Sequence, residues 1–421
     1  MNPNEAAHVK MIQDELRLHL RQIPIDDPSE REDAHKASAK AIEKILEDAN
    51  RLPEARHGNT ATQSQTDASG KVAVETEEAG GDKAVESSPE RLEEALAELD
   101  ALIGLENIKE EVRTLTKFLK VQSHREEAGL PTTKLSLHMV FGGNPGTGKT
   151  TVARIVGKVF GAMGVLKKGH LIETDRSGLV AEYVGQTGTK TNKQIDEALD
   201  GFLFIDEAYT LISAEGKDPF GHEAVQALLK RMEDDRKRLV VILARYPVEM
   251  RALLRSNPGL SSRFSRNLEF IDYTPLDLAQ IFGLMCDKNR YSLLPLARAK
   301  VTVGLDYLYC QRDRFFGNDR TSRNLFEHAI RRMANRIAKI SELSMEQLTM
   351  LEPEDIEFKK TPPELFDNLA ENEVLRFHIN CPNCDYSKDV PHKFLGQRVR
   401  CPKCNHDFDA NWGSLVEESA N

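Results

Sequence analysis

Short apolar runs alternate with segments of helical periodicity through the middle of the chain. A run of about four to eight apolar residues between glycine, proline or polar breaks is typical of a buried strand, and apolar positions three or four residues apart are typical of an amphipathic helix. Helices are predicted at 105–119, 150–160, 190–199 and 224–232, and strands at 137–141, 170–174, 202–205, 239–244 and 267–271.

This order of elements predicts an α/β fold. Strands that alternate with helices form a mainly parallel sheet covered by helices on both faces. After Pro275 the periodicity is helical as far as about Leu343, so a small helical lid subdomain is expected behind the α/β core.

The ends of the chain carry different patterns. Residues 5–22 and 29–49 have weak helical spacing, and two interpretations stay open: a helical hairpin that binds a partner or packs on the core, and a loosely ordered appendage. Residues 57–87 have almost no large apolar side chains, which predicts a flexible linker. Ser88 and Pro89 have the order of a helix N-cap and first turn, so the folded core begins there.

The predicted organisation has six parts. These are a helical N-terminal region (1–56), a flexible linker (57–87), an α/β core (88–274), a helical lid (275–345), a second linker (346–375) and a small cysteine module (376–412).

Residues 143–150 read Gly-Asn-Pro-Gly-Thr-Gly-Lys-Thr, between a predicted strand and a predicted helix. In that setting glycines let backbone N–H groups surround phosphates at a helix N-terminus. Lys149 is expected to neutralise phosphate charge and the Thr150 hydroxyl to bind Mg²⁺. The predicted strand 202–205 ends in Asp206 and Glu207, where Asp206 is expected to hold Mg²⁺ and Glu207 to polarise the attacking water of ATP hydrolysis.

Composition and charge narrow the class of protein. A net charge of −10 over 421 residues argues against a nucleic-acid protein as a whole, without excluding a local basic module. No apolar run approaches the length of a membrane span, and residues 1–10 lack the pattern of an export signal, so a cytoplasmic protein is expected.

Four of the six cysteines form two Cys-x-x-Cys pairs near the C-terminus. Sixteen residues separate Cys384 from Cys401, a spacing typical of a ribbon in which Cys381, Cys384, Cys401 and Cys404 bind one Zn²⁺. Such a ribbon is expected to recruit a partner, and whether that partner is protein or nucleic acid stays open. Cys286 completes no such pattern and is expected to be a buried thiol, as is Cys310.

Six phrases of the sequence resemble the AAA+ ATPases, and most closely the branch that contains CbbX, SpoVK and EccA. They are LIGL at 102–105, GNPGTGKT at 143–150, EYVGQT at 182–187, LFIDEAY at 203–209, NPGLSSRF at 257–264 and GNDRTSRN at 317–324. The resemblance covers roughly residues 90–345 and leaves out the N-terminal region and the cysteine module.

The resemblance implies a ring of six subunits, with each nucleotide at the boundary between neighbours. Arg263 then corresponds to an arginine finger that enters the next subunit's site, with Arg266 as a second candidate. The alternative for Arg263 is an ordinary surface salt bridge. Arg320 corresponds to the lid sensor of the γ-phosphate, with Arg323 beside it.

The resemblance also assigns nucleotide contacts and a substrate loop. The nucleotide contacts are Ile103, Gly104, Asn144, Pro145, Gly146, Thr147, Gly148, Lys149, Thr150, Thr151, Asp206, Tyr246, Arg320 and Arg323. Tyr183, Val184 and Gly185 correspond to a pore loop that grips an extended polypeptide; the alternative is that Tyr183 covers a core edge. Arg245 stands where this branch commonly has glycine, and its effect is open.

The leading hypothesis is therefore a ring ATPase that remodels or threads a protein target. A second hypothesis is an ATP-regulated scaffold that recruits partners through the zinc ribbon, and a third is a nucleic-acid motor. The expected cofactors are ATP, Mg²⁺ and Zn²⁺, and the expected partners are further copies of the chain and a protein substrate, Rubisco or another.

Overall fold

The computed structural model describes residues 88–132, 136–211, 218–245, 257–359, 361–367, 369 and 375–416. They belong to one compact unit, Gly81–Asn421. The predicted N-terminal helices and the linker at 57–87 lie outside the described residues, and so does Tyr246.

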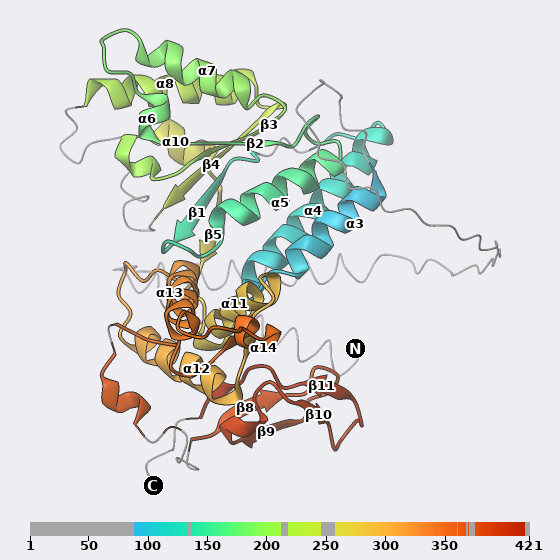
Figure 1. Cartoon of the computed structure of the whole chain (residues 1–421). Helices are drawn as coiled ribbons and strands as arrows, with labels where there is room; N and C mark the ends of the chain where they lie inside the picture. The colour runs from blue at the N-terminus through green and yellow to red at the C-terminus, as the bar shows by residue number, and fades with distance from the viewer. Residues whose placement is uncertain are drawn as a thin grey trace, which may run out of the picture. The chain divides into compact units, whose positions relative to one another are not determined.

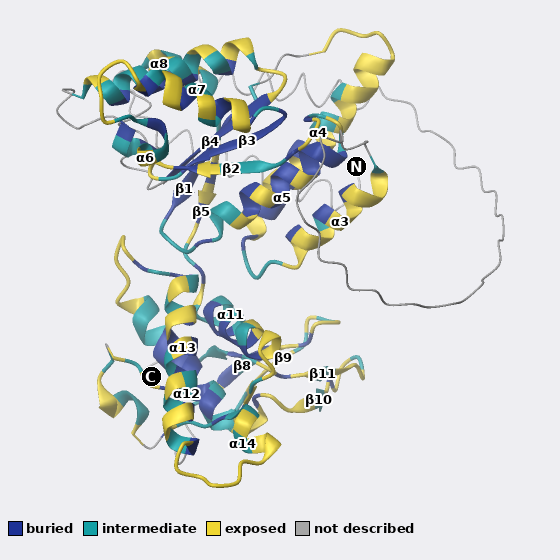
Figure 2. Ribbon diagram, turned by 45° about the horizontal axis from the view of Figure 1, so that its top comes forward, coloured by how far each residue is buried: buried dark blue, intermediate teal, exposed yellow. Residues whose placement is uncertain are grey.

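A five-stranded parallel sheet forms the centre of the core, in the order β2-β3-β4-β1-β5. The strands are β1 (Met139–Gly143), β2 (Leu171–Thr174), β3 (Gly201–Ile205), β4 (Leu239–Arg245) and β5 (Arg266–Phe270). Their apolar runs are almost fully buried in β1, β3 and β4 (Figure 2), as expected for strands covered on both faces. This confirms the predicted parallel sheet.

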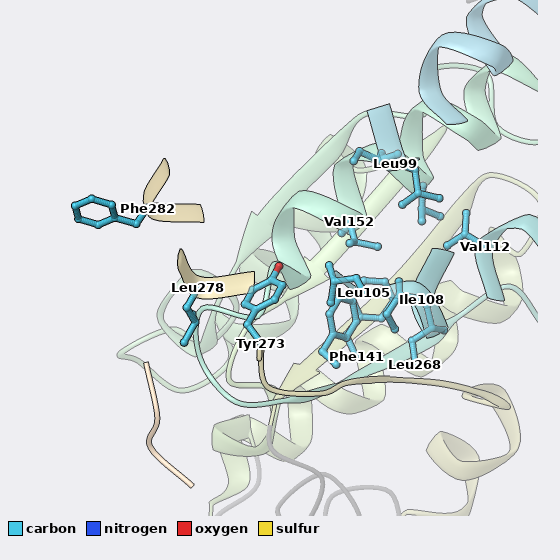
Figure 3. Close-up of a cluster of buried hydrophobic side chains, with 14 of the residues drawn as sticks. Leu99, Leu105, Ile108, Val112, Phe141, Val152, Leu268, Tyr273, Leu278 and Phe282 are labelled. Atoms are coloured by element: carbon cyan, nitrogen blue, oxygen red, sulfur yellow. The ribbon is translucent and has the colours of Figure 1, made fainter. Parts of the chain in front are cut away.

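Successive strand residues pack into two different hydrophobic clusters, because side chains alternate between the two faces of a sheet. Phe141, Phe202 and Phe204 join one cluster, whereas Leu203 and Ile205 join the other. Helices α3 (Pro89–Asp100), α4 (Glu106–Glu127) and α5 (Lys149–Ala162) lie together on the first face (Figure 1). Figure 3 shows Ile108 of α4 beside Phe141 of β1, with Val112 further along the helix in the same cluster.

The second face is covered by α7 (Thr187–Glu197) and α8 (Pro219–Asp234), with the short α6 (Arg176–Leu179) nearby (Figure 1). The short η1 (Ala208–Leu211) follows β3, and α10 (Pro258–Arg263) precedes β5. The predicted helix at 105–119 is longer than expected, since α4 continues to Glu127.

The lid follows directly. Its helices are α11 (Pro275–Lys288), α12 (Pro295–Cys310) and α13 (Asp319–Ile337). Thr274 begins α11 with a capping box in which its hydroxyl and the Asp277 carboxylate bond each other's backbone N–H. This confirms the predicted helical lid.

The prediction of a linker at 346–375 is wrong for the part up to about residue 358. After α14 (Met345–Thr349), β7 (Met350–Leu351) pairs with β6 (Ser292–Leu293) of the lid, and Leu351 and Ile356 are fully buried. The prolines and polar residues of this segment suggested a connector. Its few apolar side chains nevertheless fill the space beside α12 and α13, which gives them the burial of core residues.

The cysteine module contains two small antiparallel sheets. One has the order β12-β8-β9, with β8 (Phe377–Asn380), β9 (Ser387–Val390) and β12 (Ser414–Leu415), and the other pairs β10 (Arg398–Arg400) with β11 (Asp407–Asp409). The short η2 (Pro363–Phe366) precedes the module, and η3 (His392–Phe394) lies within it. The module extends past the predicted end at 412, because Leu415 pairs with Phe377.

The module shares its hydrophobic core with the lid. Phe377 and Leu395 are fully buried in a cluster that also contains Ala299 and Val303 of α12. A module this small buries little surface of its own. The face of α12 supplies the missing part of its core. Among the described residues, no helix has both the length and the apolar character to cross a membrane.

Candidate nucleotide and metal sites

Three segments line one cavity of about 540 Å³. They are the glycine-rich loop after β1, the end of β3 and the beginning of α13. The cavity brings together most of the residues predicted to bind or hydrolyse the nucleotide: Pro145, Gly146, Gly148, Lys149, Thr150, Thr151, Asp206, Glu207, Arg320 and Arg323. The structure therefore places residues from distant parts of the chain where the sequence predicted a common site.

The loop after β1 turns sharply into α5. Gly146 and Gly148 have φ values of 68° and 85°, a region that favours glycine. α5 begins at Lys149, so its unpaired N-terminal N–H groups border the cavity. Amides and helix dipole together favour an anionic group there.

Lys149 lies across this loop. Its Nζ donates to the carbonyl oxygens of Gly143 at 3.0 Å and Asn144 at 2.7 Å. The Thr150 hydroxyl donates to Glu173 Oε1 at 3.3 Å. Thr147 is fully buried and its hydroxyl donates to the Asn144 carbonyl at 2.9 Å, so it stabilises the loop from inside.

Asp206 and Glu207 follow β3. Asp206 Oδ1 accepts a hydrogen bond from the Glu207 N–H at 2.9 Å, and Glu207 has a φ of 50°, which is uncommon for a residue with a side chain. The turn leaves both carboxylates on the cavity. Together with the Thr150 hydroxyl, Asp206 offers the oxygen ligands that Mg²⁺ prefers beside a polyphosphate.

Arg320 and Arg323 are exposed on α13 and both line the cavity. Arg323 Nη2 lies 3.8 Å from Asp319 Oδ2. Burial raises the pKa of the Asp319 carboxyl above its ordinary value, although Arg323 and Arg320 act in the opposite direction. Asp319 was not predicted as a site residue.

Arg263 does not line this cavity. It ends α10, and its Nη2 lies 3.2 Å from Glu233 Oε2 of α8. Within one chain its contact is thus the salt bridge that the sequence left open as an alternative. Arg266 Nε is buried and has no hydrogen-bond partner in the described part of the chain.

Two other predicted nucleotide contacts, Gly104 and Ile103, do not line this cavity. Gly104 has a φ of 60°, and a Cβ there would meet the Asp277 carboxylate at 3.2 Å. Ile103 lines a different cavity of about 290 Å³, together with Arg298 and Trp412. Tyr246 and the side chain of Arg245 lie outside the described residues.

The predicted pore loop is prominently exposed. Tyr183 and Val184 are 68% and 86% exposed, and Gly185 has a φ of 79° with open space around it. An exposed aromatic beside an exposed valine is available to contact a polypeptide by area and stacking.

The four clustered cysteines meet at one point. All four Sγ atoms lie within 4.8 Å of one another, and the Sγ atoms of Cys381 and Cys404 are 3.6 Å apart, as are those of Cys384 and Cys401. These separations fit four thiolates around one tetrahedral ion. His378 is engaged elsewhere, since its Nδ1 lies 2.6 Å from Asp389 Oδ1.

Comparison with known proteins identifies the class. Residues 139–270 match the "ATPase family associated with various cellular activities (AAA)", and residues 274–364 match the "AAA lid domain". The chain belongs to the AAA family. Family membership implies nucleotide and Mg²⁺ binding and ATP hydrolysis.

Three relatives are similar over most of their length. Stage V sporulation protein K of Bacillus subtilis is 42% identical over 273 residues, which cover 64% of this chain and 84% of that protein. The chloroplastic ribulose bisphosphate carboxylase/oxygenase activase of Cyanidioschyzon merolae is 38% identical, with coverage of 68% and 98%. Protein CbbX of Cereibacter sphaeroides is 40% identical, with coverage of 62% and 85%. Both family matches end before the cysteine module.

Besides Asp319, two residues that touch the glycine-rich loop were missed as site residues. They are Asp272, between β5 and α11, and Asn318, just before α13. Asn318 lies in a motif that the family resemblance picked out, but nothing in the sequence near Asp272 shows that it meets a loop more than a hundred residues away.

Proposed function

We propose that this chain forms a homo-oligomeric ring, a hexamer, that uses ATP hydrolysis to pull on and remodel a protein target in the cytoplasm. The observation that carries this proposal is the single cavity that combines Lys149, Asp206 and Glu207 with the lid residue Arg320. A lid arginine on the same cavity as the hydrolytic carboxylate connects nucleotide state to lid position.

The chemistry follows from these positions. The loop amides and Lys149 hold the phosphates, while Thr150 and Asp206 would hold Mg²⁺. Glu207 polarises the attacking water, and Arg320 loses its charge-assisted bond when the γ-phosphate leaves.

Arg263 acts from the neighbouring subunit in this proposal. Its position outside the cavity of its own chain is the position that a residue acting in trans requires. It would exchange Glu233 for the γ-phosphate of the adjacent subunit on ring assembly.

A second cavity connects the hydrolytic carboxylates with the exposed loop. It measures about 690 Å³, and its lining includes Asp206 and Glu207 as well as Ala181 and Glu182, which directly precede Tyr183. This continuity supports a mechanism in which chemistry at Glu207 moves the Tyr183 loop along a polypeptide.

The cysteine module is proposed to bind Zn²⁺ and to recruit the target. Because it shares a core with α12, whatever binds to it moves with the lid. The name of one relative gives ribulose bisphosphate carboxylase/oxygenase as a target, so Rubisco is one candidate substrate.

The test combines two substitutions in the purified full-length chain. Glu207→Gln is expected to keep ATP binding and to lower the hydrolysis rate at least a hundredfold, because it removes the group that polarises water. Tyr183→Ala is expected to keep basal ATP hydrolysis and to abolish stimulation by an unfolded protein such as casein. Tyr183→Phe, which keeps the aromatic ring, is the matched control and should retain that stimulation.

Other outcomes favour the other hypotheses. Intact remodelling in Tyr183→Ala together with its loss in Glu207→Gln supports the scaffold. Stimulation by single-stranded nucleic acid that disappears with salt supports the motor. Full-rate hydrolysis by a monomer in sedimentation experiments contradicts the shared site with Arg263.

A further inference from the structure

A carboxylate in the hinge between core and lid joins three separate segments. Asp272 lies between β5 and α11. Its Oδ1 and Oδ2 accept hydrogen bonds from Asn144 Nδ2 at 2.8 and 3.0 Å, and its Oδ1 accepts another from Asn318 Nδ2 at 2.8 Å. Asn144 belongs to the glycine-rich loop and Asn318 to the lid.

Asn318 is fully buried and held from several sides. Its Oδ1 accepts from the Tyr273 N–H at 2.9 Å, and its Nδ2 also lies 3.2 Å from the Pro145 carbonyl oxygen. Its φ of 49° and ψ of −121° are uncommon for a residue with a side chain. A strained backbone persists only where surrounding contacts fix it, as these do.

Three consecutive residues of the glycine-rich loop are therefore tied to the hinge or lid. Asn144 is bound through its side chain and Pro145 through its carbonyl. The Gly146 carbonyl accepts a hydrogen bond from the Asp319 N–H at 3.0 Å.

These contacts decide where the loop amides point. A trans peptide unit is planar, and its C=O and N–H point in opposite directions. Bonds that hold the Pro145 and Gly146 carbonyls toward the lid turn the N–H groups of Gly146 and Thr147 the other way. Amides arranged in this way are the groups that bind phosphate in such a loop.

We propose that Asp272 and Asn318 form a positioning clamp that sets the phosphate-binding conformation of the glycine-rich loop according to the position of the lid. The clamp rests on the nucleotide site of the proposed function. It is separate from the sensor Arg320, because it acts on the loop itself and not on the γ-phosphate.

The clamp and the sensor differ in which nucleotides they affect. The loop amides hold phosphates that ADP and ATP share. Loss of the clamp should therefore weaken the binding of both nucleotides by the same factor. Arg320→Ala should weaken ATP and leave ADP unchanged. By reciprocity, any nucleotide that the clamp helps to bind also favours the clamped lid.

The test is Asp272→Asn in the full-length chain, with Mg·ADP and Mg·ATP affinities measured by calorimetry in the Glu207→Gln background. The donors to Asp272 are the side-chain amides of Asn144 and Asn318. An asparagine at 272 has nearly the same volume but no charge, and its own N–H₂ would face one of these donors, so the charge-assisted hydrogen bonds are lost. Both dissociation constants should rise by the same factor, about tenfold to a hundredfold. In the chain with Glu207 intact, KM should rise while kcat at saturating ATP changes little.

Asp287→Asn, an exposed carboxylate on α11, is the matched control and should bind nucleotides like the unsubstituted chain. Asn144→Ala removes the loop side of the same bond, so a double-mutant cycle with Asp272→Asn should give an effect smaller than the product of the two single effects. A purely structural role would lower the melting temperature without nucleotide and give no such coupling.

The clamp is refuted if Asp272→Asn and Asn144→Ala bind both nucleotides normally, or if only ATP binding is lost. Failure of Asp272→Asn to fold leaves Asn144→Ala as the deciding variant. If the unsubstituted chain itself binds no nucleotide, the proposed function fails, and this result is distinct from failure of the clamp.

Discussion

Two glycines of this chain have nearly the same backbone conformation and very different surroundings. Gly129, two residues after α4, has a φ of 69°, and a Cβ there would meet nothing within 4 Å. Gly146 has a φ of 68°, and a Cβ there would lie 2.3 Å from both the Gly317 carbonyl oxygen and Asp319 Oδ1. Substitutions at these two glycines therefore distinguish the effect of backbone strain from the effect of the close approach between lid and loop.

Gly146→Ala is therefore expected to separate the lid from the loop and to raise the dissociation constant for ADP more than tenfold. Gly129→Ala should cost about 1–2 kcal/mol of stability through its left-handed backbone alone and should leave ADP affinity unchanged. Calorimetry with ADP and thermal melting measure the two effects. Equal ADP affinity in both variants would show that the close approach at Gly146 does not matter.

His138 makes stability depend on pH. Burial lowers its pKa from 6.5 to about 4, against a hydrogen bond to the Met232 carbonyl that acts in the opposite direction. Its Nδ1 accepts from the Val241 N–H at 3.0 Å, a bond that only the imidazole with an unprotonated Nδ1 can make. The unfolded chain thus binds a proton at this residue that the folded chain does not.

The direction in which stability changes with pH follows from the difference in bound protons between the unfolded and folded states. Between pH 6.5 and about 4 the unfolded state holds more protons, so stability is full above pH 6.5 and falls as the pH decreases, by about 3 kcal/mol in total. Urea unfolding between pH 4.5 and 7.5 measures this loss. His138→Gln should lack this part of the pH dependence; an unchanged slope in that variant would assign the loss to other groups.

At the scale of elements, two ion pairs join α13 to the segment that follows α14. Arg336 donates from Nε and Nη2 to Asp355, whose side chain is 2% exposed. Arg332 pairs with Glu357, which is 47% exposed. The pairs join the same elements and differ in burial.

Asp355→Asn is expected to destabilise the chain by about 3 kcal/mol or more, because it leaves the partly buried Arg336 without its main partner. Glu357→Gln should cost less than about 1 kcal/mol, since water screens an exposed pair. Denaturant unfolding compares the two. Similar small losses would mean that residues 350–358 contribute little to the lid.

At the scale of the whole molecule, the chain's single tryptophan reports on the contact between the cysteine module and the lid. Trp412 lies against Gly283 of α11, where a Cβ would meet its Nε1 at 2.7 Å, and Arg298 of α12 lies 5.0 Å over its ring. Chelation of the proposed Zn²⁺ should unfold the module and expose Trp412 and the covered face of α12.

The expected results are a red shift of tryptophan emission, a lower melting temperature and increased binding of a hydrophobic dye. Cys404→Ser should reproduce all three without chelator. Cys310, which was expected to be buried, is exposed at the end of α12 and lies outside the cluster. Cys310→Ser is therefore the control and should change none of them. Elemental analysis verifies that the metal is lost. If tryptophan emission then stays unchanged, docking of the module on the lid does not depend on metal.

The features that the sequence predicts correctly are those whose chemistry is local to a few residues. The glycine-rich loop, the Asp206–Glu207 pair and the Cys-x-x-Cys pairs are each recognisable within a few residues. The helices and strands followed from periodicity, because a buried face imposes its spacing on neighbouring side chains. The sequence therefore predicts the parallel sheet, the lid and the cysteine cluster, and the structure contains all three.

Only the tertiary structure decided which distant segments meet. Asp272 and Asn318 contact the glycine-rich loop, residues 350–358 pack into the lid, and α12 completes the core of the cysteine module. Each of these contacts joins residues far apart in the chain, and none imposes a periodicity on its neighbours. The sequence by itself determined the elements and the chemical groups, whereas the path of the chain in space determined which groups act together.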